Sequence, residues 1–299
     1  MTWRPPRVPG RLSQGPALAV AVAAVIVLAS GVLAVVTWTS GASGGHPSAG
    51  ATAAPGAGPA GPASASAPGG QLVAGNVASV PMPALPAGGS GTIVALVIVS
   101  GVPSVSVNVA AMPGTLVRAT TGGGYGARPV LDDLPGTSQD QAAGVPAAAV
   151  VLSLTPAAAP GGAGQAGAAL SVTVSPDVTW QLDFGGGAGP VAVNMTGGQV
   201  AGLDFAQGVS QASVTLPQPS GTVPLRLEGG ASQLTVSVPD GVPARVTAGD
   251  GASQVTVGGA RYTGVAAGTV ITQPGWASAT GRLDIDATSG VSQVQVTQE

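Results

Sequence analysis

Short stretches of alternating apolar and polar residues recur along the second half of the chain, each introduced by a glycine. The phrase Gly-x-Ser-Gln-x-x-Val begins at Gly208, Gly230, Gly251 and Gly290. These glycines are 22, 21 and 39 residues apart, and the last interval is close to two periods with one degenerate copy between. Alternation with period two places successive side chains on opposite faces of a β-strand. A repeat of about 21 residues built on such strands predicts the stacked turns of a β-solenoid.

A second strand in each turn carries a charged residue between two apolar ones. Asp183, Asp204, Arg226 and Arg245 occupy that position, at intervals of 21, 22 and 19 residues. The apolar neighbours should point inward; they are Leu182, Phe184, Leu203, Phe205, Leu225 and Leu227. We therefore expect an all-β, flattened β-solenoid with two strands per turn. Its charged positions should stack into an outer column in which Asp204 lies next to Arg226.

The repeated phrase itself splits into two faces by the same alternation. Its apolar residues should point inward and its glutamines outward, so that Gln211, Gln233 and Gln254 form a column whose amides could hydrogen-bond along it. The repeated serines, such as Ser232, should point inward at a turn corner. We interpret them as backbone caps rather than nucleophiles, because the folded part has no histidine to activate a serine.

The N-terminal segment has the pattern of a membrane anchor. Residues 1–15 contain three arginines and no acidic residue, and residues 17–36 are apolar except for Ser30 and Gly31. A helix of this length spans roughly 30 Å, the thickness of the hydrocarbon core of a bilayer. The arginines predict a cytoplasmic arm at 1–15, a transmembrane helix at 16–39 and an extracytoplasmic remainder. The alternative is a cleaved signal peptide.

Composition changes sharply after this segment. Residues 40–70 contain only Gly, Ala, Pro, Ser and Thr apart from His46, and residues 71–90 add a little Val and Leu. Such a segment has too few apolar side chains to offset the entropy of ordering it. We expect a disordered linker over 40–90 and one extracytoplasmic domain over 91–299. The bilayer is therefore one expected partner, through the N-terminal helix.

Charge and residue usage exclude several function classes. The net charge is −3, all nine basic residues are arginines and no nucleic-acid-binding motif is present, so we expect no nucleic-acid partner. Cysteine and lysine are absent, and the single histidine lies in the expected linker. Acid–base and nucleophilic catalysis normally use these residues or a buried carboxylate pair. We expect a protein that is not an enzyme and has no cofactor or bound metal.

Five residues are candidates for a binding surface: Trp276, Tyr125, Asp204, Arg226 and Arg245. A tryptophan or tyrosine exposed on a loop is often an energetic centre of a binding interface. Trp276 could equally cover the hydrophobic end of the solenoid. The charged column could bind a ligand, although a ladder of ion pairs that fixes strand register is the simpler interpretation.

The repeated phrases, together with residues 180–187, 219–224 and 274–276, resemble the bacterial toastrack-type family. Its members are extracytoplasmic β-solenoid domains, often membrane-anchored, related to adhesin-like head domains and to the C-terminal domain of LiaF-like cell-wall stress proteins. The resemblance covers residues 170–299 well and 91–170 loosely. It implies association with the cell envelope and supplies no catalytic residues.

The sequence therefore favours a membrane-anchored binding or scaffolding module of the cell envelope. The expected partners are cell-wall polymer, another envelope protein or a second copy of the chain. The alternative is an envelope-stress sensor. A sensor would need a membrane partner, because fifteen cytoplasmic residues cannot form a signalling domain.

Overall fold

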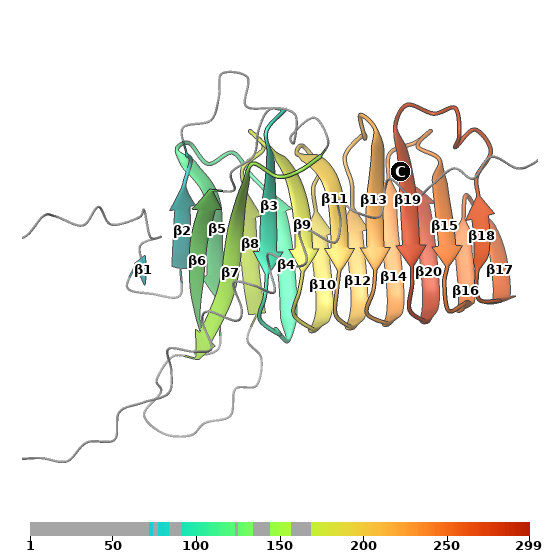
Figure 1. Cartoon of the computed structure of the whole chain (residues 1–299), viewed down its shortest axis with the longest axis horizontal. Helices are drawn as coiled ribbons and strands as arrows, with labels where there is room; N and C mark the ends of the chain where they lie inside the picture. The colour runs from blue at the N-terminus through green and yellow to red at the C-terminus, as the bar shows by residue number, and fades with distance from the viewer. Residues whose placement is uncertain (1–71, 74–76, 84–90, 123–124, 134–143, 157–168) are drawn as a thin grey trace, which may run out of the picture. The chain divides into compact units, whose positions relative to one another are not determined.

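The computed structural model describes residues 72–73, 77–83, 91–122, 125–133, 144–156 and 169–299. These residues form strands and loops with no α-helix, so the predicted all-β class is confirmed (Figure 1). The predicted cytoplasmic arm, transmembrane helix and most of the predicted linker lie outside the described residues. Within the described part, no helix is long and apolar enough to cross a membrane.

The described strands belong to two sheets, here called sheet A and sheet B. In spatial order, sheet A contains β1 (Leu72–Val73), β2 (Val77–Pro81), β5 (Thr115–Thr121), β8 (Ala169–Val174), β4 (Ser104–Val109), β10 (Ala188–Asn194), β12 (Val209–Thr215), β14 (Ala231–Val238), β20 (Val291–Gln298), β16 (Ala252–Val257) and β17 (Ala260–Val265). Sheet B contains β18 (Thr269–Thr272), β15 (Ala244–Ala248), β19 (Arg282–Ala287), β13 (Thr222–Leu227), β11 (Gln199–Phe205), β9 (Thr179–Phe184), β3 (Ile93–Ile98), β7 (Ala148–Pro156) and β6 (Tyr125–Asp133).

Most strands come in pairs in which a sheet B strand is followed along the chain by a sheet A strand. We call each such pair a rung, and the described residues contain seven. Their spatial order is β7–β8, β3–β4, β9–β10, β11–β12, β13–β14, β19–β20 and β15–β16. Neighbouring rungs are joined by parallel pairing in both sheets. Each repeat therefore contributes one strand to each sheet, which agrees with the two strands predicted for it.

The spatial order of the rungs departs from sequence order at both ends. The final rung, β19–β20, lies between β13–β14 and β15–β16, and β3–β4 lies between β7–β8 and β9–β10 (Figure 1). The 39-residue interval before Gly290 therefore does not contain a degenerate turn. Its residues 258–281 form β17 and β18, and the chain then returns to insert its last rung.

Antiparallel strands cover the outermost rungs. β17 and β18 pair with β16 and β15 at one end, and β5 and β6 pair with β8 and β7 at the other. An uncovered edge strand presents unpaired amide and carbonyl groups that can recruit another chain. These four strands protect the rungs from edge-to-edge pairing.

Glycines make the corners between the two strands of a rung close enough to stack. Val209 N donates to Gly230 O at 3.1 Å, and a Cβ on Gly208 would lie 3.5 Å from the same oxygen. One position earlier the fit is tighter, because a Cβ on Gly229 would lie 2.1 Å from the carbonyl carbon of Gln207. The close approach that excludes a side chain is therefore at Gly229, whereas a Cβ on the repeated Gly208 would be in ordinary van der Waals contact.

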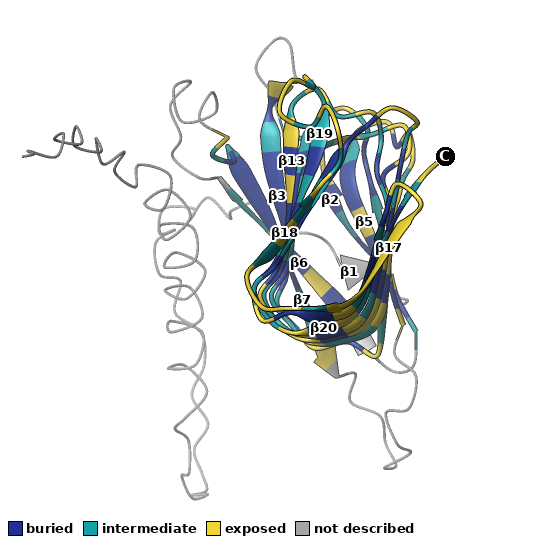
Figure 2. Cartoon of the chain, turned by 90° about the vertical axis from the view of Figure 1, so that its right-hand side faces the viewer, coloured by how far each residue is buried: buried dark blue, intermediate teal, exposed yellow. Residues whose placement is uncertain are grey.

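The core lies between the two sheets (Figure 2). All six side chains predicted to point inward from the second strand are at most 2% exposed; they are Leu182, Phe184, Leu203, Phe205, Leu225 and Leu227. Phe184 and Phe205 stack with ring centroids 4.8 Å apart, and the buried Trp180 donates its indole N–H to Ser175 O at 2.8 Å. The inward-facing side chains at equivalent positions of successive rungs thus form continuous apolar columns between the sheets.

Two details differ from the expectation for the repeated phrase. The serine in each copy is exposed, as at Ser232, and the preceding residue Ala231 is buried instead. Ser232 and Gln233 both face outward, so alternation is interrupted once where the strand leaves its corner. The predicted glutamine column exists, but Gln293 lies between Gln233 and Gln254.

The folded part also begins earlier than Gly91. β2 (Val77–Pro81), within the residues expected to be linker, pairs with β5, and its Ala78 and Val80 are buried. The sequence gives little sign of this strand, because it has only two inward-facing apolar residues and the residues around it are rich in proline and glycine.

Candidate functional site

The rung strands of the two sheets differ in charge, whereas the flanking strands β5 and β17 of sheet A carry the exposed Arg118 and Arg261. The seven rung strands of sheet B carry seven charged side chains: Asp183, Asp204, Arg226, Arg245, Arg282, Asp284 and Asp286. In sheet A, the described rung strands have no charged residue. We call these surfaces the charged face, formed by the outward side chains of β9, β11, β13, β19 and β15, and the uncharged face, formed by those of the rung strands of sheet A.

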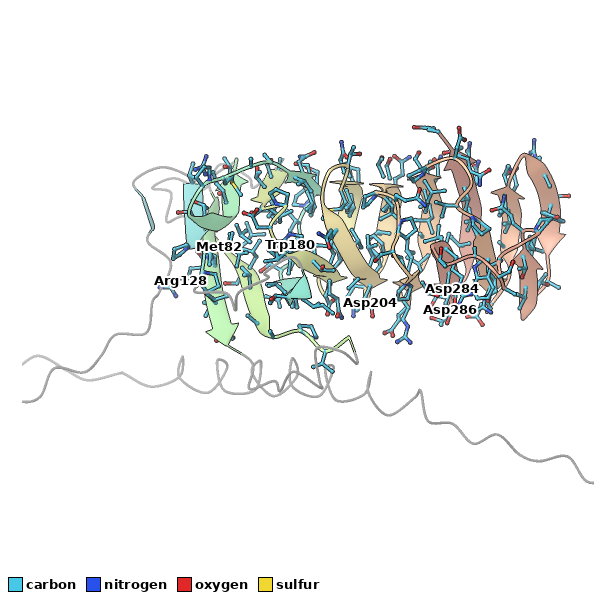
Figure 3. All side chains as sticks on the ribbon, turned by 90° about the horizontal axis from the view of Figure 1, so that it is seen from above. Met82, Arg128, Trp180, Asp204, Asp284 and Asp286 are labelled. Carbon is cyan, nitrogen blue, oxygen red and sulfur yellow. The ribbon has the colours of Figure 1, made fainter. Side chains whose placement is uncertain are left out.

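One column of the charged face contains two acidic side chains in succession. Asp183 is in register with Asp204, Asp204 with Arg226, and Arg226 with Asp286. Figure 3 shows Asp204, Asp284 and Asp286 along one side of the stack, with Trp180 in its interior. The predicted proximity of Asp204 and Arg226 is thus present in the register, although no ion pair joins them among the described residues.

The environment makes this column hard to ionise. Burial, with a smaller contribution from the Glu228 carboxylate, raises the pKa of Asp183 to about 6. The pKa of Asp204 rises to about 7, chiefly through burial and then through the nearby carboxylates of Asp183 and Glu228, against the opposing effect of Arg226. One buried carboxylate oxygen of Asp204, Oδ1, has no hydrogen-bond partner. Of these two carboxylates, Asp204 is therefore the one whose ionisation is disfavoured more strongly.

A second cluster on the charged face consists of side chains that bind one another. Arg245 Nε donates to Asp284 Oδ1 at 2.8 Å, and a second guanidinium nitrogen pairs with Asp284 Oδ2. The guanidinium carbons of Arg245 and Arg282 lie 3.9 and 4.6 Å from the centroid of the Trp276 ring. The Trp276 indole N–H donates to Leu283 O at 2.8 Å. This cluster fastens the connection between β18 and β19 to the sheet.

The five candidate residues from the sequence are only partly brought together. Asp204, Arg226, Arg245 and Trp276 share the charged face, whereas Tyr125 begins β6, near the other end of sheet B. Arg245 does not continue the column of Arg226. It is in register with Asp284 in the neighbouring column, because β19 lies between β13 and β15.

Trp276 does not cover the hydrophobic end of the stack, where β17 and β18 lie. Its ring is occupied by two guanidinium groups and its indole N–H by a backbone carbonyl. It is consequently placed to hold a loop, with only part of its surface available to a ligand.

The uncharged face consists of hydroxyl, amide and small apolar side chains arranged in columns that run from strand to strand. The column at the centre of the face contains Ser171, Ser106, Ala192, Ser213, Thr235, Gln295 and Thr256. The amides of Gln233 and Gln254 donate to the hydroxyls of Thr235 and Thr256 on their own strands. The Gln254 amide oxygen also accepts a hydrogen bond from the Arg261 guanidinium on β17 at 2.5 Å. The bonds of these two glutamines therefore differ from the bonding along the column that the sequence suggested.

A shallow groove of about 510 Å³ crosses the uncharged face over β8, β4, β10, β12 and β14. Its lining includes Ser106, Ala192 and Ser213 from the central column, and Pro190, Gln211 and Gln233 beside them. The central side chains are small, so the face is hollowed along the stack. On β20, beyond the end of the groove, the central column is occupied by the larger side chain of Gln295.

The sequence did not predict this groove because no single residue type signals it. Serine, alanine and glutamine carry no such signal individually. A usable signal was the absence of charge from the sheet A strand of every described rung, beside its presence in the sheet B strand of five of the seven rungs.

No three His, Cys, Asp or Glu side chains gather anywhere in the described ranges in a way that could hold a metal ion. Asp132 lies within β6, where it pairs in register with Ala149.

A scan against protein-family models finds no match, and a search of curated proteins also finds none. Among solved structures, the chain is similar to a crystal structure described as that of a putative cell adhesion protein from Clostridium sporogenes. The TM-score is 0.52 at 12% sequence identity, over 75% of this chain and 98% of the other. At that identity the likeness concerns the all-β fold.

Proposed function

We propose that this chain is a non-enzymatic, adhesin-like binding module of the cell envelope, and that the uncharged face is its contact surface. The observation that carries the proposal is the segregation of charge: the rung strands of sheet A present a long, grooved surface without a charged side chain of their own, and the rung strands of sheet B carry all seven charged residues of the described rungs. If charged residues were placed at random along the stack, the rung strands of both sheets would carry them.

The architecture suits a contact surface that must hold its shape. Each internal rung is hydrogen-bonded to a neighbour on both sides in both sheets, and the outermost rungs are covered. Seven strands spaced about 4.8 Å apart give a surface roughly 29 Å long between the outermost strands. Side chains on such a surface are held in fixed rows, which lowers the conformational entropy lost on binding.

We interpret the stack as a flattened β-solenoid whose end rungs are inserted out of sequence order, related to the toastrack-type domains. The fold of the similar cell adhesion protein is compatible with this interpretation. We further propose that the apolar segment at 16–39 anchors the chain, with residues 1–15 in the cytoplasm and the domain outside.

The test is co-sedimentation of the detergent-solubilised full-length chain with isolated cell-wall sacculi. We expect the chain to sediment with the sacculi, and Ser213→Arg on the uncharged face to reduce the retained fraction. Trp276→Ala on the charged face serves as the matched control and should leave retention unchanged. If the unaltered chain stays in the supernatant, wall binding is refuted. If only Trp276→Ala reduces retention, the contact surface is the charged face.

A second candidate, a sensor acting through a membrane partner, is favoured by one observation. Asp183 and Asp204 are adjacent in register, and their pKa values lie near neutrality, so acidification would change the charge of this column. Crosslinking of the full-length chain in membranes at pH 5 and pH 8 tests it. A partner captured at only one pH, and lost in Asp204→Asn, supports the sensor.

A further inference from the structure

Resting on the proposed function, we infer that the groove of the uncharged face binds a segment of a neutral polysaccharide. The groove crosses β8, β4, β10, β12 and β14 in sheet A, on the opposite side of the core from the charged face. The ligand class follows from its charge, its shape and the chemistry of its lining.

The charge of the lining excludes polyelectrolytes. Anionic polymers are recognised through arginine or lysine, and cationic ones through carboxylates. The groove residues include neither, and the described strands that carry them have no charged residue at all. A charged ligand would lose its hydration here without gaining a partner of opposite charge. The ligand that fits the groove is therefore uncharged.

The shape indicates an extended ligand. The groove follows the stack across five neighbouring strands, so that four steps of about 4.8 Å make it roughly 19 Å long. Its lining repeats from strand to strand because the rungs are in register, as at Ala192 and Ser213. A repeating surface matches a polymer with a repeating unit better than it matches a compact small molecule.

The lining chemistry corresponds to sugar rings. Ser104, Ser106 and Ser213 present hydroxyls, and Gln211 presents an amide, so the lining both donates and accepts hydrogen bonds. Pro190 and Ala192 add apolar surface between these groups, which can cover the C–H face of a ring. Alternation of hydroxyl-rich and apolar surface on the scale of one side chain is the property that a neutral glycan shares with this groove.

Other occupants fit less well. An extended peptide binds a sheet by adding to an edge, and here the outermost rungs are already paired with β17 and β5 in sheet A. Single-stranded nucleic acid binds through basic grooves and stacked aromatic rings, both absent from the groove lining. A second copy meeting this one face to face would bring two hollowed surfaces together and leave a gap where close packing is needed.

The experiment is binding of the full-length chain, in detergent, to an array that carries neutral and acidic oligosaccharides. Ser213 is exposed on the outer face of β12, so Ser213→Arg and Ser213→Glu should fold, which circular dichroism checks. We expect neutral glycans to be bound and both variants to lose affinity about tenfold or more, because either charge is desolvated against an uncharged ligand. The control Gln295→Arg, in the same column beyond the groove, should bind as the unaltered chain does.

The opposite-charge pair makes the result decisive. If Ser213→Arg strengthens binding and Ser213→Glu abolishes it, the ligand is anionic and the inference is wrong. If no neutral glycan is bound, the inference is also overturned. If the chain nevertheless sediments with sacculi, the proposed function still holds and the ligand is another component of the wall. If the chain sediments as a dimer that Ser213→Arg dissociates, and glycan binding is absent, the occupant of the face is a second copy.

Discussion

Replacing Asp204 by asparagine should stabilise the protein at pH 8 and leave it nearly unchanged at pH 4. Asp204 is adjacent to Asp183 on one side and Arg226 on the other, and its buried Oδ1 accepts no hydrogen bond. Asparagine keeps the shape of the side chain and removes the charge that burial and neighbouring carboxylates disfavour.

The magnitude follows from the difference between folded and unfolded pKa values. The folded-state pKa of about 7 lies above the ordinary value of 3.8, so the folded protein holds its proton more tightly than the unfolded chain does. The stabilisation is fully present below pH 3.8 and is lost as the pH rises towards 7. The difference between these two pKa values corresponds to at most about 4 kcal/mol of folding stability. Because Asp204 is only partly buried, solvent screening reduces this value. We therefore expect Asp204→Asn to raise the free energy of unfolding at pH 8 by about 1–2 kcal/mol.

The measurement is the free energy of unfolding by urea, followed by circular dichroism, at several values between pH 4 and pH 8. Asp286→Asn is the matched control, since Asp286 is adjacent to the same Arg226 and has Thr247 rather than a carboxylate on its other side. We expect the gain in free energy of unfolding on Asp204→Asn to increase with pH, and we expect no such increase for the control. A loss of stability in Asp204→Asn that is as large at pH 8 as at pH 4 would refute the reasoning.

Three further predictions test the packing. Gly229→Ala should destabilise the fold by about 2–4 kcal/mol, because its Cβ would overlap the Gln207 backbone, whereas Gly221→Ala, with nothing within 4 Å, should change stability by under about 1 kcal/mol in the same urea titration. Trp276→Ala should cost about 1–2 kcal/mol through its two cation–π contacts and its hydrogen bond, and should increase proteolysis between β18 and β19. Truncation after Gly281 removes β19 and β20, the pairing partners of β13–β14 and β15–β16, and should lower the thermal midpoint sharply; an unchanged midpoint would contradict the inserted position of the last rung.

The charged and uncharged faces show how site prediction depends on neighbours across the stack. Alternation correctly placed Asp204 and Arg226 outside and next to each other, because both lie in consecutive, regularly spaced turns. It placed Arg245 in the wrong column, since its true neighbour Asp284 comes 39 residues later in the chain. The groove was missed for a related reason: a hollow depends on the sizes of side chains on five strands at once.

The sequence by itself determined the strand pairs of the repeats, the direction of most side chains and the corner glycines, although it did not determine the outward direction of the repeated serines. These features are local, because alternation and backbone conformation act within one turn of the chain. The inward positions of Leu203, Phe205, Leu225 and Leu227 follow from that alternation alone and are confirmed.

Only the tertiary structure decided which rung lies beside which. The repeated phrases at Gly230, Gly251 and Gly290 present nearly the same residues to a neighbour, so local pairing would be satisfied by several orders of stacking. The strands β17 and β18 occupy the outer side of β16 and β15, and the last rung can then pair only in the interior. The neighbours of each charge, and hence the raised pKa of Asp204, follow from that choice.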